Sequence, residues 1–355
     1  MKRTSVLLMA LMLCISILYA KKPQKNDAPA ADYRVSCIAF YNLENLFDTV
    51  NDPLINDEEF LPDGGMHWTA LKYEHKVHNM AYALSQLGTD LDPRGAAVIG
   101  VSEIENRAVM EDVAADPVWG DRKMAIVHYD GPDRRGVDVG LFYDPNRFLV
   151  THTASHRLTM PDNPDFRTRD QLVVSGYLKE MGEKIHIVVN HWPSRYGGEV
   201  ASRPKRAAAA ELTKHIVDSI YAREPKAKII VMGDLNDDPY NIPCSKVLGA
   251  KRTREEVGQQ GLFNTMWQLL DRGIGSLAYN GSWNLFDQII ISEPLLNADP
   301  AKELSYYKAQ IFNKDFLTIQ EGKDKGTPKR THKAGVWLDG YSDHYPTMIY
   351  LIKKK

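Results

Sequence analysis

The chain has 355 residues, of which 43% are hydrophobic and 25% are charged, and its formal net charge is −2. This length and composition allow a sizeable hydrophobic core and exclude disorder as the main state of the chain. The near-neutral charge excludes a global basic field that would hold a polyanion.

Residues 1–20 have the pattern of a secretory signal. Two basic residues precede an apolar run that closes at Ala20, a small residue typical of a cleavage site. The run is too short to span a bilayer comfortably. Cys14 makes a lipoprotein the minority alternative, because the residue before it is not small. We therefore expect export through a signal peptide that is cleaved after Ala20, to the periplasm or the outside of the cell.

Residues 21–32 are polar, contain Pro and Ala, and show no periodicity, so we interpret them as a linker. No long Gly/Ser/Pro-rich stretch interrupts residues 33–355, which favours one domain. Once the signal is removed, Cys37 and Cys244 remain. A disulfide between them is allowed in an oxidising compartment but is not indicated by the sequence.

Short apolar runs alternate with helical patterns along this domain. Several runs are rich in β-branched residues at nearly every position, which favours strands buried on both faces. Strands are predicted at residues 35–41, 97–101, 124–128, 137–143, 172–178, 184–190, 229–232, 288–291 and 347–352. Helices are predicted at residues 68–87, 201–222 and 243–248. Many strands with few helices favour two sheets packed face to face, with the helices outside.

Two kinds of segment do not follow this pattern. Residues 293–341 have little periodicity apart from residues 306–312, and we expect a long loop that is functional or mobile. Three basic stretches, at residues 203–206, 251–254 and 323–333, are interpreted as solvated surface, because most Lys and Arg side chains lie outside.

Polar residues able to bind a metal ion or a phosphate follow one apolar strand after another. The first strand ends at Asn42 and Glu44, which would point to one face because side chains alternate along a strand. Glu103 follows the next apolar run. The ordinary alternatives are a turn at the first position and a helix-opening acid at the second.

The same pattern recurs in the second half of the chain. The stretch IIVMGDLNDDP runs from a buried strand into several acids before Pro239. A polar turn and a structural histidine remain the alternatives for single positions. The residues at these strand ends are Asn190 and His191, Asp234 and Asn236, Asp287, and Asp343 and His344. Six strand ends of this kind make coincidence a poor explanation, so we expect one common site.

The chemistry of this set indicates a hard metal ion. The oxygen ligands Asn42, Glu44, Glu103 and Asp343, with two imidazoles and no thiolate, suit Mg²⁺, or Mn²⁺ and Ca²⁺, rather than zinc. Such an ion beside a general base and an amide donor equips a site for attack of water on a phosphate ester. Neither a P-loop nor a Gly-x-Ser-x-Gly elbow is found in the sequence.

At these motifs the chain resembles the endonuclease/exonuclease/phosphatase superfamily, which includes deoxyribonuclease I, apurinic endonucleases, neutral sphingomyelinases and inositol polyphosphate 5-phosphatases. The matching motifs are N-x-E at 42–44, S-E at 102–103, N-H-W-P-S-R at 190–195, G-D-L-N at 233–236, F-D-Q-I-I-I-S at 286–292 and S-D-H at 342–344. They span nearly all of the chain from residue 33. The resemblance implies a four-layer α/β sandwich of two mostly antiparallel β-sheets flanked by helices, with the site at one rim.

The resemblance also implies how a metal ion would be held. Glu103 would be the principal ligand, assisted by Asn42 and Glu44 and, from the far side, by Asp343. The chain departs from the family at one of these positions, because many relatives have Asp where this chain has Glu44.

The remaining motif residues would carry the catalysis. By resemblance, His344 would be the base that activates water, oriented by Asp287, and Asp234 would align that water or help to deprotonate it. Asn236 and His191 would contact the scissile phosphate.

A further arginine is a candidate for substrate binding. Arg135 lies in the stretch RRGVDVGLFYDP and could bind a substrate phosphate through two parallel hydrogen bonds. Asp138, in the same stretch, could orient a site residue. A surface arginine and a strand acid are the ordinary alternatives.

Our leading hypothesis is a secreted, Mg²⁺-dependent nuclease acting on DNA or RNA. The alternative is a sphingomyelinase-type enzyme or a phosphoinositide phosphohydrolase, whose substrate is a phospholipid or inositol phosphate. That alternative predicts an exposed membrane-facing loop, with the candidate aromatic residues Tyr306, Tyr307, Phe312, Phe316 and Trp337. A non-catalytic binding protein would have a damaged set of site residues, whereas this set is intact. No protein partner is indicated.

Overall fold

The computed structural model of the chain describes residues 29, 32–279 and 281–355. The predicted signal at residues 1–20 and most of the predicted linker at 21–32 lie outside the described residues, and both stay predictions. In the part of the chain that the structure describes, no helix has the length and apolar character needed to cross a membrane.

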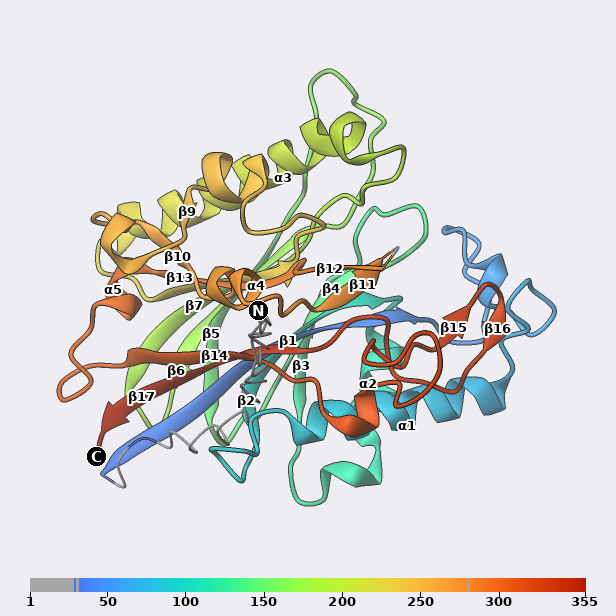
Figure 1. The fold of residues 1–355 in the computed structure, drawn as a ribbon, viewed down its shortest axis with the longest axis horizontal. Coiled ribbons are helices and arrows are strands. Elements are labelled where there is room, and N and C mark those ends of the chain that lie inside the picture. Colours follow the sequence, from blue (N-terminus) through green and yellow to red (C-terminus); the bar gives the residue numbers. More distant parts are fainter. Residues whose placement is uncertain (1–28, 30–31, 280) are drawn as a thin grey trace, which may run out of the picture.

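The first β-sheet has six strands in the described part, in the order β14-β17-β1-β2-β4-β3 (Figure 1). These strands are β1 (Tyr33–Leu46), β2 (Ala96–Ile104), β3 (Ala125–His128), β4 (Asp138–Tyr143), β14 (Ser305–Ile311) and β17 (Thr347–Lys354). β1 and β2 run parallel, and the other neighbours are antiparallel. In the pair of β1 and β17, Tyr33 lies opposite Lys354 at one end and Phe40 opposite Thr347 toward the other.

The second β-sheet has seven strands within the described residues, in the order β5-β6-β7-β8-β13-β10-β9. They are β5 (Phe148–His156), β6 (Gln171–Leu178), β7 (Glu183–His191), β8 (Ile229–Asp234), β9 (Ala250–Lys251), β10 (Leu262–Asn264) and β13 (Asp287–Ser292). The pairs β7–β8 and β10–β9 are parallel and the others antiparallel.

The two sheets pack face to face between helices (Figure 1). Helices α1 (Ala70–Gln86) and α2 (Arg107–Ala115) lie on the side of the first sheet, and α3 (Glu199–Arg223) covers the second. The sheets approach closely at Gly100 of β2, where an added Cβ atom would lie 2.5 Å from Sδ of Met232 in β8. The four-layer sandwich of two mostly antiparallel sheets confirms the predicted fold class.

Smaller elements complete the fold. The hairpin of β11 (Leu277–Tyr279) and β12 (Ser282–Asn284) and that of β15 (His332–Lys333) and β16 (Val336–Trp337) stand apart from the two sheets. The short helices are α4 (Trp267–Asp271), α5 (Glu293–Leu296) and a π-helical segment (Pro243–Val247). Cys37 and Cys244 are free, buried thiols.

The nine predicted strands coincide with strands of the structure. The sequence did not predict six strands of two or three residues in the described part, nor the longer strands β5 and β14. Both are edge strands, and most of their residues are exposed or half-buried. An edge strand buries less of its surface than a central one, so its sequence need not show a clean apolar pattern. The prediction of one long loop at residues 293–341 is therefore wrong in part, because this segment contains α5, β14 and the β15–β16 hairpin.

The aromatic residues of this segment do not form the exposed loop that a membrane-binding enzyme would need. Phe312 is buried, and Phe316 packs against it with ring centroids 6.1 Å apart. Tyr306 packs against Phe263, and Trp337 packs edge-on against Trp68. These side chains stabilise the fold instead of presenting an apolar surface to a bilayer.

His332 makes the stability of this region depend on pH. Its ring is buried between Trp68 and Trp337, at centroid distances of 5.4 and 5.2 Å. Burial, together with the charges of Lys76 and Lys72, lowers the pKa of His332 to about 4.

We expect the folded chain to lose stability as the pH falls from about 6.5 toward 4. In this window the unfolded histidine takes up a proton that the folded one resists, so protonation favours unfolding, by about 3 kcal/mol for a pKa difference of this size. Urea unfolding at pH 7 and pH 4 measures the loss of unfolding free energy between these two pH values. This loss should be about 3 kcal/mol smaller in His332→Phe than in the wild type. Equal losses in the two proteins would contradict this assignment.

Candidate active site

The strand register brings three of the predicted residues into one row across the second sheet. β7 and β8 pair with His191 opposite Asp234, and β8 and β13 pair with Asp234 opposite Asp287. In the first sheet Asn42 lies beside Ser102, directly before Glu103. Nδ2 of Asn42 donates a hydrogen bond of 3.1 Å to Oδ2 of Asp234, which shows that this end of β1 faces the row in the second sheet.

Asp234 lies at the centre of this arrangement. Its Oδ1 accepts a hydrogen bond of 2.9 Å from the backbone N–H of Asn236, and Nε2 of His191 lies 3.7 Å from its Oδ2. Burial raises the pKa of Asp234 to about 7, with the charge of His344 opposing this shift and that of Asp287 adding to it. The carboxyl group can therefore exchange a proton near neutral pH.

Glu103 is held in an unusual backbone conformation. Its φ is 59°, although it lies within β2, and Asn45 next to Glu44 has a φ of 51°. Non-glycine residues rarely adopt positive φ, and such strain is concentrated at functional sites. The backbone N–H of Asn45 donates to Oε2 of Glu103 at 3.0 Å, while Oε1 lies 3.8 Å from Nε2 of His191. This conformation aims the Glu103 carboxylate at the row of site residues.

His344 and Asp287 form a buried pair. Nδ1 of His344 lies 2.7 Å from Oδ2 of Asp287, which also accepts a hydrogen bond of 2.5 Å from the hydroxyl of Ser276. Burial works against a charged His344, but the negative charges of Asp287, Asp343 and Asp234 outweigh it and raise the pKa of His344 well above its usual value. The other ring nitrogen, Nε2, lies 3.8 Å from Oδ1 of Asp343. Asp287 thus fixes the orientation of the ring.

His191 is a neutral imidazole. Burial lowers its pKa well below the usual value, and the positive charges of Arg169, Arg135 and His344 add to this effect. Within the described residues, its Nδ1 has no hydrogen-bond partner. A neutral, buried imidazole beside two carboxylates can contact a phosphate or a metal ion.

Three groups of described side chains have the spacing of metal ligands, and two of them belong to this site; the third is His128, Asp130 and Asp138. Glu103, His191 and Asp234 each offer a ligand atom within 4.8 Å of the others, and the same holds for Asp234, Asp287 and His344. The donors are carboxylate oxygens and imidazoles without a thiolate, which fits a hard divalent cation.

Asn236 has a positive φ of 49° and is held from two sides. The side-chain N–H of Asn236 donates to the carbonyl of Trp192 at 3.0 Å, and Nε of Arg195 donates to the backbone carbonyl of Asn236 at 2.9 Å. The guanidinium of Arg195 in turn lies 4.4 Å from the ring centroid of Phe286. The loops after β7 and β8 and the start of β13 are thereby joined behind Asn236.

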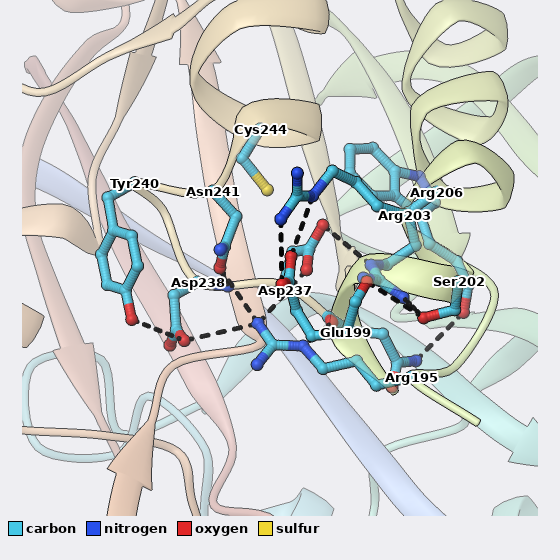
Figure 2. Close-up of polar contacts among 12 residues, drawn as sticks. Arg195, Glu199, Ser202, Arg203, Arg206, Asp237, Asp238, Tyr240, Asn241 and Cys244 are labelled. Atoms are coloured by element: carbon cyan, nitrogen blue, oxygen red, sulfur yellow. Dashed lines mark hydrogen bonds and ion pairs between the residues drawn. The ribbon is translucent and has the colours of Figure 1, made fainter. Parts of the chain in front are cut away.

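The two acids after Asn236 belong to a buried ionic network, which Figure 2 shows. Asp237 and Arg206 are both fully buried, with Oδ2 and Nε 2.8 Å apart. Arg195 lies 3.2 Å from Asp237 and 3.5 Å from Asp238. Oδ1 of Asp238 accepts a hydrogen bond from the backbone N–H of Leu285. In the stretch GDLNDDP, Asp234 therefore faces the site, while the next two acids hold the loop in place.

This network corrects the interpretation of residues 203–206 as solvated surface. Arg203 follows the prediction and pairs with Glu199 on the exposed side of α3. Arg206 is instead buried, and its guanidinium also donates to the hydroxyl of Ser202 and to the carbonyl of Glu199. A helix has two faces, and a cluster of basic letters does not show which of them a side chain joins.

Glu44 and Asp343 are linked to each other by Arg330. Oε1 of Glu44 and Oδ2 of Asp343 each lie 3.0 Å from Nη2 of Arg330. Oε2 of Glu44 accepts a hydrogen bond of 2.6 Å from the backbone N–H of Thr331. Within residues 323–333, interpreted as solvated surface, Arg330 is partly exposed as expected, but its guanidinium also pairs with two predicted site residues. No local sequence signal indicates these contacts.

Within the described residues, no hydrogen bond or ion pair joins Arg135 or Asp138 to the centre of the site, although the charge of Arg135 helps to lower the pKa of His191. The Arg135 side chain is 52% exposed, and its Nε lies 3.9 Å from Oδ1 of Asp133. Asp138 binds the backbone N–H of Gly131 and lies 3.3 Å from Nε2 of His128. Arg135 stays a predicted substrate contact. Asp138 orients His128 and the loop at Gly131, and neither of these is a predicted site residue.

A cavity of about 650 Å³ lies away from this centre, between β5, β6 and β7 and helix α3. Its lining includes His152, His156, His186 and His215 but none of the predicted site residues. The candidate site is thus distinguished by its clustered charges at the ends of strands and not by a deep cavity.

The sequence matches the model of a family described as "Endonuclease/Exonuclease/phosphatase family" over residues 37–353. No curated protein matches at a significant level. Among solved structures, an endonuclease/exonuclease/phosphatase family protein from Bacteroides thetaiotaomicron is 14% identical, with a TM-score of 0.54 over 91% of this chain and 96% of that one. A humanized D. rerio TDP2 is 13% identical, with a TM-score of 0.54 over 89% and 98% of the two chains.

A third similar structure is the mannosyl-6-phosphatase Bt3783 from Bacteroides thetaiotaomicron VPI-5482. It is 15% identical, with a TM-score of 0.53 over 89% of this chain and 99% of that one. At such low identity these structures show the fold alone, since one fold carries many substrates.

Proposed function

The chain belongs to the endonuclease/exonuclease/phosphatase family, whose members are phosphoester hydrolases. Within this family, we infer that it is an exported nuclease that uses a divalent cation. The observation that carries the proposal is the buried pair of His344 and Asp287 beside a second carboxylate, Asp234. Export rests on the pattern of residues 1–20.

His344 would act as the general base in its neutral form; the neighbouring carboxylates favour the protonated ring, and the positive charge of a bound cation would counter them. Asp287 holds Nδ1, so Nε2 is the nitrogen left to take a proton from the attacking water. Asp234, whose ligand atom lies within 4.8 Å of those of His344 and Asp287, would orient the water. Asn236 and His191 would contact the scissile phosphate, and Arg135 would bind a neighbouring phosphate of the substrate.

A divalent cation would be held by Glu103 as principal ligand, with Asn42, Glu44 and Asp343 assisting. Mg²⁺ is the first choice, and Mn²⁺ or Ca²⁺ would also suit these oxygen donors. Such an ion, when bound, supplies charge stabilisation for the phosphate oxygens in the transition state.

The choice of a nucleic acid rests on the sequence motifs and on one similar structure. That structure is described as D. rerio TDP2 complexed with single strand DNA product, and it is 14% identical with a TM-score of 0.51. The second candidate is a phosphohydrolase for a phospholipid, an inositol phosphate or another small phosphate ester. The likeness to a mannosyl-6-phosphatase supports a small phosphate ester.

Incubation of supercoiled plasmid with the mature protein from Lys21 tests the proposal. We expect nicking with Mg²⁺, no nicking with excess chelator, and a loss of at least about 10²-fold in rate for Asp234→Ala. Activity that survives the chelator would contradict the divalent cation. A failure to nick with Mg²⁺, Mn²⁺ or Ca²⁺, together with hydrolysis of a small phosphate ester, would replace the nuclease by the second candidate.

A further inference from the structure

Arg330 holds together two carboxylates that the proposed function assigns to a divalent cation. Its Nη2 lies 3.0 Å from both Oε1 of Glu44 and Oδ2 of Asp343, and its Nε donates to Oε1 of Glu44 at 3.1 Å. We propose that Arg330 is the counter-ion of these carboxylates in the cation-free protein, and that it competes with the divalent cation for them. This inference rests on the proposed function, because it requires that the cation binds here.

The position of Arg330 is fixed by its neighbours in the chain. The backbone N–H of Lys329 donates to the carbonyl of Leu317, and the carbonyl of Lys329 accepts from Tyr341. On the other side, Thr331 donates its N–H to Glu44. The guanidinium is thus brought to the carboxylates by a segment that is bonded on both sides of it.

The two carboxylates of Glu44 and Asp343 need two positively charged side chains nearby. Glu44 is buried, and the like charge of Asp343 beside it would be costly without compensation. Burial and the Asp343 charge both act against an ionised Glu44, whereas the positive charges of Lys76 and Arg330 favour it. Two carboxylates are therefore balanced by one lysine and one arginine.

The positively charged side chains of Lys76 and Arg330 differ in how easily they can move away from the carboxylates. Lys76 is fully buried, and its amine donates at 2.5 Å to both the hydroxyl of Thr331 and the carbonyl of Tyr341. The Arg330 side chain is 39% exposed, so it can turn into solvent. When a divalent cation takes these carboxylates, Arg330 is the positive charge that gives way while Lys76 stays.

Binding of the cation therefore has to break the contacts of Arg330, which lowers the affinity. We expect Arg330→Gln to bind Mg²⁺ and Mn²⁺ about tenfold more tightly than the wild type, equal to about 1.4 kcal/mol. The matched control is Lys329→Gln, which removes the same charge from the adjacent residue, whose amine lies over the ring of Tyr341 at 5.9 Å. Its affinity should equal that of the wild type.

The affinity is measured without substrate, by Mn²⁺ electron paramagnetic resonance and by calorimetry with Mg²⁺. Thermal unfolding gives a second readout: without cation Arg330→Gln should melt below the wild type, and Mg²⁺ should raise its Tm by more. Arg330→Lys, which keeps the charge, should bind the cation like the wild type.

Equal or weaker cation binding by Arg330→Gln, with normal binding by the wild type, would overturn this inference and leave the proposed function standing. If neither protein binds a divalent cation, the metal dependence in the proposed function fails as well, and the inference with it.

Discussion

Replacement of His344 by Ala is expected to lower kcat for phosphodiester hydrolysis by about 10²- to 10⁴-fold, the usual contribution of a positioned general base. His344 has one ring nitrogen held by Asp287, and the ring lies within a cluster of carboxylates. No other described histidine is paired with Asp287. Hydrolysis of bis(p-nitrophenyl) phosphate with Mg²⁺ measures the change without depending on the identity of the natural substrate.

Two further variants separate catalysis from folding. His152→Ala removes an exposed histidine at the distant cavity and should leave kcat unchanged. Asp287→Asn keeps the size of the side chain but not its charge, so it should lower kcat while the protein stays folded. If His344→Ala instead unfolds at room temperature, or keeps its activity, then His344 is a structural residue and not the base.

The second large effect is expected on stability, at Asp237. Asp237→Ala leaves the fully buried guanidinium of Arg206 without its carboxylate, and an uncompensated buried charge of this kind costs about 3–5 kcal/mol. That is a large share of the 5–15 kcal/mol by which folded domains are stable, as a rough range. Urea unfolding of the variant and the wild type gives the difference directly.

A surface pair on the same helix provides the matched control. Lys214 and Asp218 form an exposed ion pair on α3, and Asp218→Ala should cost less than about 1 kcal/mol. The double variant Arg206→Met with Asp237→Ala should be more stable than Asp237→Ala alone, because the buried Arg206 charge is removed together with its partner. A small effect of Asp237→Ala alone would mean that water or a remaining carboxylate compensates the charge of Arg206.

The parts of the candidate site that could be predicted from the sequence are those encoded next to buried strands. Asp234 comes one glycine after an apolar run, and Asp287 directly precedes one, so the sequence places both at strand ends. The register of β8 with β13 then brings the two residues opposite each other. Local pattern and the rules of sheet pairing are enough for this step.

Contacts between distant segments could not be predicted in this way. Arg330 meets Glu44 across 286 positions of the chain, and Arg206 meets Asp237 from within a helix whose basic residues look alike in sequence. The positive φ of Glu103 within β2 could not be predicted either, because it follows from contacts such as that with Asn45 and not from the residue type. Such features depend on which loops the folded sheets bring together.

The antiparallel pairing of β1 with β17 has a practical consequence. Tyr33 and Lys354 lie side by side, whereas Asn42 and Glu44 lie on the same strand about 30–35 Å away, at roughly 3.3 Å per residue. An affinity tag, a fusion partner or a tether joined at either of these two positions is attached far from the candidate site. Protein immobilised on a bead through a tether at either of these two positions should thus remain accessible to large substrates.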